Sequence, residues 1–342
     1  MKFQIDSSPH LPPVNDVSRL MRQVLLALLP GIAVASWYFG WGVLINLGVA
    51  TLLAVGFETL ILAIRRRPVV PVISDYSAVV TAWLLVLALP PLAPWWLLTI
   101  GVFFAIVVAK QLYGGLGYNP FNPAMVGYVV LLISFPAAMT NWMAPTTLAD
   151  FHLGLSDALR VTFTGEFPPG LDWDAITAAT PLDTVRSGLR LGESISEMQG
   201  QIPFGLLAGE GWEWISIAFL LGGLWLLWKG IIDWQVPVGL LAALGLLSAV
   251  FSLYDPEYFS SPLYQLLGGG AMLGAFFIAT DPVSGSTTPL GRLLFGIGVG
   301  TITFVIRSWG GYPDGIAFGV LLMNMAAPMI DEYTRPRVYG ER

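Results

Sequence analysis

The sequence predicts an all-α polytopic membrane protein with ten transmembrane helices. Hydrophobic residues make up 55% of the 342 residues and charged residues only 11%, whereas a typical soluble domain has about 25% charged residues. Ten apolar runs are long enough to cross a bilayer, which takes roughly 17–25 residues. Basic residues gather at alternate ends of these runs. The chain is therefore expected to have the lipid bilayer around most of its surface.

The ten runs follow one another with short connections, except after the fifth. They cover residues 22–40, 42–64, 74–91, 95–112, 122–141, 213–230, 235–253, 262–280, 290–307 and 313–330. Pro90, Pro91 and Pro94 separate the third run from the fourth, because proline ends a helix.

Lysine and arginine set the orientation of the runs, since they concentrate on the cytoplasmic side. With the N-terminus inside, all but four of the 16 basic residues fall on that side. The exceptions are Arg160, Arg186, Arg190 and Arg307. Both terminal segments, 1–21 and 331–342, are thus expected in the cytoplasm of a bacterial cell whose inner membrane holds the chain.

Residues 142–212 form one long polar segment, which we expect to be an outward-facing, periplasmic extension between helices 5 and 6. It divides the membrane part into residues 22–141 and 213–330. The two parts share a pattern: "KQLYGGLGYNPFNPAMVGYVVLL" starts at Lys110 and "IRSWGGYPDGIAFGVLLMN" starts at Ile306. Because the first joins two helices inside and the second joins two helices outside, the pattern predicts two inverted five-helix repeats. The alternative is that such turns are simply common in membrane proteins.

Composition excludes several kinds of chemistry. The chain has no cysteine, so disulfides and cysteine-held iron–sulfur clusters are absent. The two histidines, His10 and His152, lie outside the apolar runs, which argues against a haem in the membrane. We expect no metal site and no nucleic-acid partner. Any redox chemistry must come from an organic cofactor.

The stretch "WDAITAATPLD", residues 173–183, is unusually polar for this chain. Thr180 is a good helix N-cap, Pro181 suits the first helical position and Asp183 the third, so a helix is predicted to begin here. A helix N-terminus also favours a phosphate. The threonine hydroxyl therefore has two interpretations, as a structural cap and as an attachment point.

The same stretch resembles the motif Asp-x-x-(Ser/Thr)-x-Ala-Thr, to whose last threonine a flavin transferase attaches FMN through its phosphate. The matching residues are Asp174, Thr177, Ala179 and Thr180, with alanines where the family usually has glycine, at positions 175 and 178. Three further motifs resemble the same family: "GGLGYNPFNPAMVGY", "TDPVS" and "GGYPDGIAFGVLLMN". Over residues 1–340 the chain resembles the D subunit of Rnf-type electron-transport complexes and the related B subunit of the sodium-pumping NADH:quinone oxidoreductase.

This resemblance implies a redox subunit that is not catalytic alone. It implies covalent FMN on Thr180 outside the membrane and a non-covalent riboflavin near the cytoplasmic face. Its partners would be the other subunits of the complex, which transfers electrons between ferredoxin and NAD(H) and moves H⁺ or Na⁺. Polar turn residues are the candidates for the second flavin, although each can equally be a helix cap: Asn119, Asn122, Asp281 and Ser284.

Charged residues at membrane depth are a separate signal. Glu58 lies inside the second run, where an acidic residue marks either a cation path or a group that pairs with a basic residue or with a neighbouring subunit. Asp75, Lys110, Asp233 and Arg307 lie at the ends of runs, where we expect their side chains to reach the membrane surface. Asp314 is expected to stabilise the start of the tenth helix.

The main alternative function is a permeation protein without a redox cofactor, because five-helix inverted repeats also build small-solute channels and transporters. A scaffold that only anchors other subunits is a third interpretation. The motif around Thr180 favours the redox subunit, since a channel has no need of it.

Overall fold

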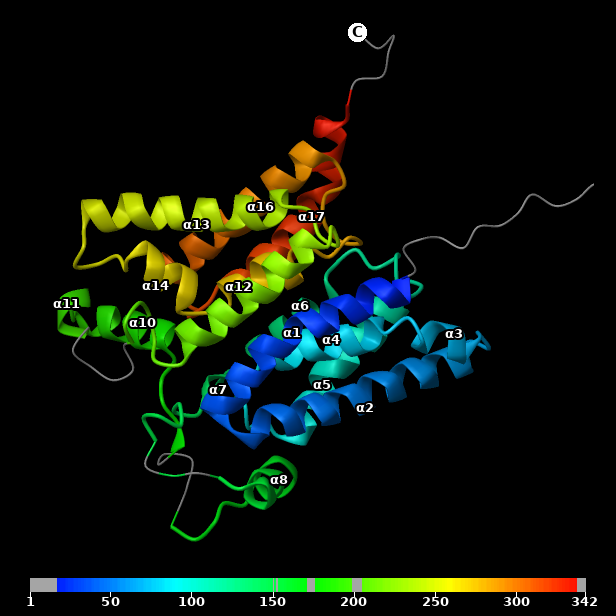
Figure 1. Ribbon diagram of the computed structural model, residues 1–342, viewed down its shortest axis with the longest axis horizontal. Coiled ribbons are helices and arrows are strands. Elements are labelled where there is room, and N and C mark those ends of the chain that lie inside the picture. The colour runs from blue at the N-terminus through cyan, green and yellow to red at the C-terminus, as the bar shows by residue number, and fades with distance from the viewer. Residues whose placement is uncertain (1–16, 150, 152, 171–175, 199–204, 337–342) are drawn as a thin grey trace, which may run out of the picture.

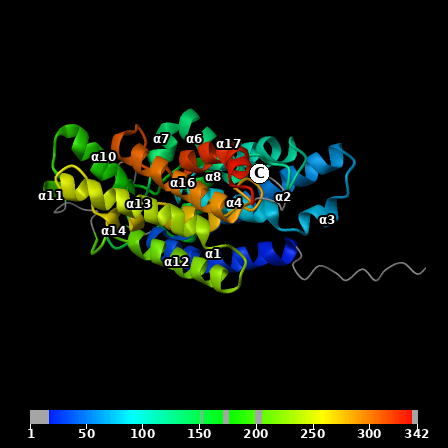
Figure 2. The ribbon, with the colours of Figure 1, turned by 90° about the horizontal axis from the view of Figure 1, so that it is seen from above.

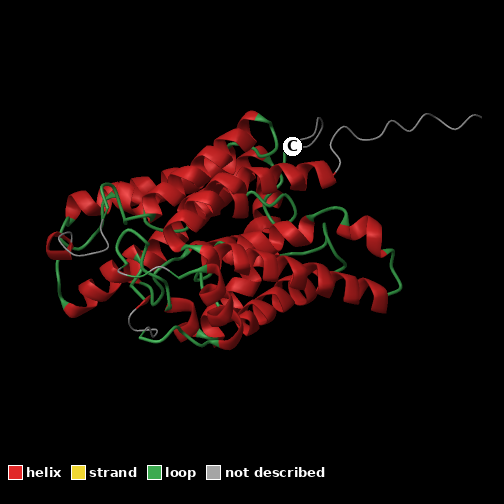
Figure 3. Cartoon of the chain, turned by 60° about the horizontal axis from the view of Figure 1, so that its bottom comes forward, coloured by secondary structure: helices red, strands yellow, loops and turns green. Residues whose placement is uncertain are grey.

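The computed structural model describes residues 17–149, 151, 153–170, 176–198 and 205–336. His10, His152 and Asp174 lie outside these residues. Within them the regular structure is helical, apart from one isolated bridge between Met143 and Thr177 (Figure 3).

The helices form a first and a second half, separated by the extension. The first half contains α1 (Val17–Phe39), α2 (Trp41–Ile64), α3 (Val69–Ile73), α4 (Ser77–Val86), α5 (Trp95–Val102), the π-helix η1 (Phe103–Gln111), α6 (Pro123–Ser134) and α7 (Pro136–Thr140). The extension contains α8 (Leu155–Thr164), α10 (Pro181–Leu191) and α11 (Ile195–Met198). The second half contains α12 (Trp212–Trp228), α13 (Gln235–Tyr254), α14 (Pro262–Leu267), α15 (Ala271–Leu273), the π-helix η2 (Gly274–Ile278), α16 (Pro289–Trp309) and α17 (Ile316–Thr334).

Each half gathers into its own bundle, and α1 and α12 lie side by side where the bundles meet (Figures 1 and 2). Small residues allow this close approach. A Cβ added to Gly222 would lie 2.1 Å from the carbonyl oxygen of Ala27, and one added to Gly31 would lie 2.1 Å from the ring of Phe219. Glycine at such crossings is typical of helices that pack in lipid.

Among the described residues, four helices are long and apolar enough to cross a membrane: α1, α2, α13 and α16. Their outward faces carry exposed leucines, such as Leu52, Leu246 and Leu253, as expected of lipid-facing surfaces. Four shorter apolar helical stretches lie beside them, at residues 77–86, 95–111, 123–134 and 212–228. The protein is thus an all-helical polytopic membrane protein, while the count of ten spans and the inverted repeat stay predictions.

Three of the predicted runs are interrupted, and one of them, 122–141, is divided at Phe135 into α6 and α7. The other two border the candidate site. The run 74–91 contains only α4 as a helix, because Tyr76 adopts a left-handed conformation before it (φ 62°) and the prolines at 90, 91 and 94 follow it. The run 262–280 is divided by Gly268–Gly270 into α14 and the continuous pair α15–η2. These two interruptions fall in the third run of a half, and the candidate site is built around them.

Candidate functional site

Thr180 is the N-cap of α10, as predicted. Its backbone is extended (φ −66°, ψ 157°), Pro181 follows at the first helical position, and its Oγ1 accepts a hydrogen bond from the Asp183 amide at 3.2 Å. The residues before it are held against the segment after α7: the Ala144 amide donates to the Ile176 carbonyl at 3.1 Å, and the Ala178 amide donates to the Trp142 carbonyl at 2.9 Å. Thr180 is therefore fixed from both sides.

The start of α10 is docked on the second half of the protein. The Tyr264 hydroxyl donates to the Pro181 carbonyl, and Pro181 and Leu182 pack on glycines. A Cβ on Gly209 would lie 2.0 Å from Cγ of Pro181, and one on Gly269 would lie 2.4 Å from Cδ1 of Leu182. The N-terminus of α10 thus has one position relative to the membrane helices.

Thr180 faces a cavity of about 110 Å³ between the two halves, which we call the Thr180 cavity. On the side of the first half, the end of α4 and the start of α6 line the cavity. On the side of the second half, it is lined by the break between α14 and α15 and by the start of α17. Three aromatic side chains and a glycine turn stand out in the lining: Tyr128, Trp142, Trp212 and Gly268–Gly270. Flat rings beside a small-residue turn suit a planar aromatic group.

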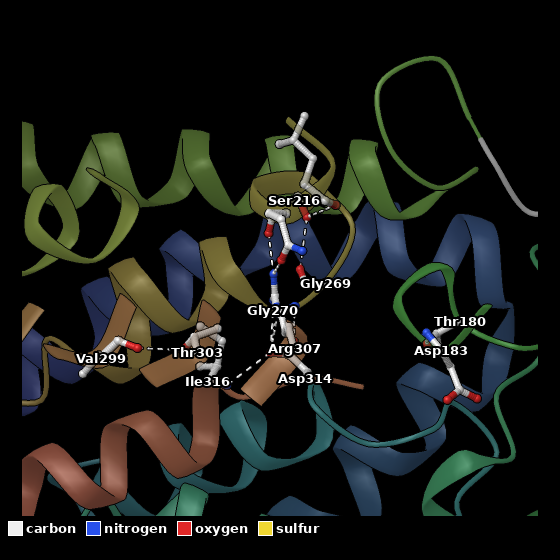
Figure 4. A network of polar contacts seen from close by, with 12 residues as sticks. Thr180, Asp183, Ser216, Gly269, Gly270, Val299, Thr303, Arg307, Asp314 and Ile316 are labelled. Atoms are coloured by element: carbon white, nitrogen blue, oxygen red, sulfur yellow. Dashed lines mark hydrogen bonds and ion pairs between the residues drawn. The ribbon is translucent and has the colours of Figure 1, made fainter. Parts of the chain in front are cut away.

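An ion pair between the buried Arg307 and the partly buried Asp314 supports this glycine turn (Figure 4). Arg307 donates from Nη2 to Oδ1 of Asp314 at 3.0 Å, and Asp314 accepts from the Gly270 amide at 2.9 Å through Oδ2. Arg307 Nε also donates to Oδ1 of Asp314 at 3.1 Å, and Nη1 donates to the carbonyl and side-chain oxygens of Gln265. The side chain of Arg307 is only 1% exposed, so the expectation that it reaches the membrane surface is wrong: an anionic partner within the protein satisfies it instead.

A second cavity, of about 140 Å³, lies at the opposite ends of α4 and α12, and we call it the Lys110 cavity. It lies towards the end of the molecule that carries Arg65, Arg66 and Arg67, which we call the arginine end. Asn119, Asn122 and Asp281 all line it. Ser284 stands behind, donating to Asp281 at 2.8 Å. The four residues named as candidates for the second flavin therefore come together at one place.

Asn324 joins the two halves at this cavity. Its Oδ1 accepts from the Asn122 amide at 3.0 Å, and its Nδ2 donates to the Ser284 carbonyl at 3.0 Å. Asn122 in turn donates from Nδ2 to the Ile278 carbonyl at 3.2 Å and caps α6 by accepting from the Met125 amide. Sequence reasoning missed Asn324 as a site residue, although it ends the second repeated motif and is a polar residue within an apolar helix.

One acceptor in the Lys110 cavity has no partner among the described residues. Oδ1 of Asn119 is buried and accepts no hydrogen bond, while its Nδ2 donates to the Phe121 carbonyl at 3.0 Å. A buried polar atom without a partner costs about 1–3 kcal/mol, so a ligand with an N–H donor would be stabilised here. Burial also raises the pKa of Asp281, although hydrogen bonds from Ser284 and the Val283 amide oppose that shift.

Lys110 forms a buried ion pair with Glu58. Their Nζ and Oε1 atoms are 2.6 Å apart, and the side chains are 2% and 0% exposed. Of the two interpretations of Glu58, pairing with a basic residue is thus confirmed. The expectation that Lys110 reaches the membrane surface is wrong, because Glu58 and Ser77 hold its ammonium group inside the protein.

The two cavities lie back to back, separated by a thin wall. Met125 and Ile278 line the Thr180 cavity, whereas their neighbours Ala124 and Phe277 line the Lys110 cavity. Along α4 the ten-residue step from Ser77 to Leu87 links the two, a rise of about 15 Å. Both π-helices lie at these cavities, as π-helical segments often do at functional sites.

Comparison with known proteins places the chain in a family. The family described as NQR2, RnfD, RnfE matches residues 4–340. The chain belongs to this family. Proteins described as the D subunit of an ion-translocating oxidoreductase complex are similar over their full length: one from Escherichia fergusonii is 50% identical over 100% of this chain and 99% of its own length. Relatives from Vibrio vulnificus and Vibrio atlanticus are 51% and 52% identical, each over 99% of this chain and 100% of their own length.

Membership in the NQR2, RnfD, RnfE family confirms the resemblance drawn from the motifs. It makes the chain a membrane subunit of an ion-translocating, Rnf-type electron-transport complex. The repeated motifs "GGLGYNPFNPAMVGY" and "GGYPDGIAFGVLLMN" carry side chains to the two cavities, which gives those motifs a structural reason.

Proposed function

We propose that this chain is the flavin-carrying subunit of a complex that transfers electrons between ferredoxin and NAD(H) and couples the transfer to movement of H⁺ or Na⁺. FMN would be joined to Thr180 through a phosphoester, after modification by a flavin transferase. Riboflavin would occupy the Lys110 cavity without a covalent bond. When bound, a flavin supplies one- and two-electron chemistry that no side chain of this chain provides.

The observation that carries the proposal is the position of Thr180, at a helix N-cap and at the mouth of an aromatic cavity. The cap presents the hydroxyl, the positive end of α10 favours a phosphate, and Tyr128, Trp142 and Trp212 offer ring surfaces. Asp174, which the motif would use for recognition by the transferase together with Thr177, lies outside the described residues.

The polar side chains of the Lys110 cavity are the groups that would hold the second flavin. Asn119 and Asn122 would orient the ring by hydrogen bonds, Asn324 would position Asn122, and Asp281 with Ser284 would close the second-half side. The thin wall at Met125 and Ile278 would keep two flavins close while excluding water between them. In membrane terms, the arginine end would face the cytoplasm and Thr180 the periplasm.

In-gel flavin fluorescence tests the proposal. The chain is produced together with its flavin transferase and run on a denaturing gel. The wild-type band should fluoresce and the Thr180→Val band should be dark, because valine matches threonine in shape but lacks the hydroxyl. Thr184→Val is the matched control, since this hydroxyl lies one turn along α10 and bonds only to the Thr180 carbonyl among the described residues. A dark wild-type band would leave the permeation protein as the better interpretation.

A further inference from the structure

We propose that Asp75, Ser77 and Lys110 form a proton path from the arginine end of the protein into the Lys110 cavity, and that Lys110 delivers the proton to the redox group held there. The identity of that group rests on the proposed function. The path itself rests on side chains that hydrogen-bond in sequence from the protein surface to the cavity wall.

The three residues form a continuous chain. The half-buried carboxylate of Asp75 follows α3 at the arginine end, and its Oδ1 accepts from the Ser77 hydroxyl at 2.5 Å. Ser77 Oγ in turn accepts from Lys110 Nζ at 2.7 Å. Ser77 and Lys110 both line the cavity, so each link from surface to cavity is a direct contact.

Each group can perform its part. A lysine ammonium can lose a proton in a buried site, which an arginine guanidinium does not do. A serine hydroxyl donates and accepts at once. After Lys110 has given up a proton, Asp75 takes up a proton from water. Asp75 then passes this proton to Ser77 Oγ, while the Ser77 hydroxyl gives its own proton to Lys110 Nζ. This restores the ammonium, the hydroxyl and the Asp75 carboxylate.

Glu58 provides the driving force for this return. Its Oε1 accepts from Lys110 Nζ and from Gln111 Nε2 at 2.7 Å, while its buried Oε2 has no partner in the described part of the chain. If Lys110 became neutral, Glu58 would be a buried carboxylate without a countercharge, which is strongly unfavourable. The pair therefore favours rapid reprotonation of Lys110.

In the described part of the chain, other charged groups near Lys110 are Asp281, Arg65 and Arg67, whose Nη1 donates to the Gly114 carbonyl at 3.0 Å. Asp281 lines the same cavity from the second half. Arg65, at the end of α2, donates to the Gln111 carbonyl. Among the described residues, three acidic side chains, Glu58, Asp75 and Asp281, thus lie around Lys110 and Ser77, while the nearby guanidinium groups donate to backbone carbonyls.

The Thr180 cavity lacks such a path among the described residues. The corresponding cation there is Arg307, which keeps its proton and directs its donors to Asp314 and Gln265. Among the described residues, this difference between lysine and arginine assigns the proposed proton path to the arginine end.

The test uses the full chain in the Thr180→Val background, where bound riboflavin is the remaining flavin. Riboflavin per chain is measured first in each variant. A light flash then reduces the riboflavin through a deazaflavin sensitiser, and a pH-indicator dye in weak buffer follows proton uptake.

Ser77→Ala breaks the path, Asp75→Asn keeps hydrogen bonding but carries no proton, and Lys110→Arg keeps the charge but releases no proton. Ser74→Ala is the matched control, because its hydroxyl bonds to the Val70 carbonyl outside the path.

Proton uptake should slow at least about tenfold, equivalent to about 1.4 kcal/mol in barrier, in Ser77→Ala and Asp75→Asn. It should be lost in Lys110→Arg and unchanged in Ser74→Ala. Uptake at the parent rate in the Lys110→Arg or Ser77→Ala chain with riboflavin bound would overturn the path while leaving the proposed function intact. A parent chain without riboflavin would overturn both.

Discussion

Asn324 shows how one side chain can hold two halves of a membrane protein together. It lies in the apolar helix α17, is 4% exposed, and bonds to the turn before α6 and to the loop after η2. Both partners are backbone groups, so its position fixes the chain path on both sides of the Lys110 cavity. An amide is needed here because it donates and accepts at the same time.

We predict that Asn324→Leu will lose most of the non-covalent flavin while the covalent flavin on Thr180 stays. Leucine keeps the approximate size but leaves two buried backbone groups unpaired, at about 1–3 kcal/mol each. Flavin released from purified protein by acid, per chain, is the measurement. Asn46→Leu is the control, because Asn46 is equally buried and bonds to the Pro91 carbonyl, away from this cavity. Equal loss of flavin in both variants would contradict a specific role for Asn324.

At the scale of elements, the interrupted third run of each half is the central feature. α4 begins after a turn at Asp75–Tyr76, and α15 begins after Gly268–Gly270. A basic residue near the end of the fourth run contacts each interruption: Lys110 bonds to Ser77, and Arg307 bonds to Gln265. Interrupted helices in corresponding positions commonly form the binding sites of membrane proteins built from inverted repeats.

Removing the ion pair between Arg307 and Asp314 should destabilise the protein strongly. We predict that Arg307→Met lowers the free energy of unfolding by about 3–5 kcal/mol, because Asp314 is left without its countercharge. Thermal unfolding in detergent, followed by circular dichroism, measures the effect. Arg292→Met removes a pair with the exposed Asp233 and should cost less than about 1 kcal/mol. Similar unfolding temperatures for the two variants would contradict the role of the Arg307–Asp314 pair.

The sequence predicted the long helices well, because apolar length and proline positions decide them. α2 and α13 begin and end within one residue of the predicted runs 42–64 and 235–253, and the Thr180 cap follows from local chemistry alone. The resemblance grouped Asn119, Asn122, Asp281 and Ser284 as candidates for one site, but the sequence did not reveal the hydrogen bonds of Asn324 that join the two halves there. It also misjudged Lys110 and Arg307, because a basic residue at the end of a run looks the same whether it reaches water or a buried carboxylate.

For the whole molecule, the two bundles meet along α1 and α12 (Figure 1), and both cavities lie between the halves. The helices α4 and α12 each begin at one cavity and end at the other, so the two cavities lie at opposite ends of these helices. This arrangement is what a carrier of electrons from one side of a membrane to the other requires. The proposed orientation, with the arginine end in the cytoplasm, can be tested directly.

The chain has no cysteine, so single introduced cysteines report orientation without background. We predict that Glu166→Cys, in the extension, reacts with a membrane-impermeant maleimide in cells whose outer membrane alone is permeabilised. Tyr118→Cys, in an exposed turn at the arginine end, should react only after the inner membrane is opened as well. The reverse pattern would invert the proposed orientation.

The flavin content of the purified chain decides whether this protein is a flavin-carrying subunit. The chain is produced with its flavin transferase, treated with acid, and separated into precipitated protein and soluble flavin, each of which is then quantified and identified by chromatography. We predict one FMN that stays on the protein and one riboflavin that is released, because the structure offers the Thr180 hydroxyl at a helix N-cap beside one cavity and a separate polar cavity beside Lys110. A chain that holds no flavin, or whose entire flavin content is released by acid, would contradict the account.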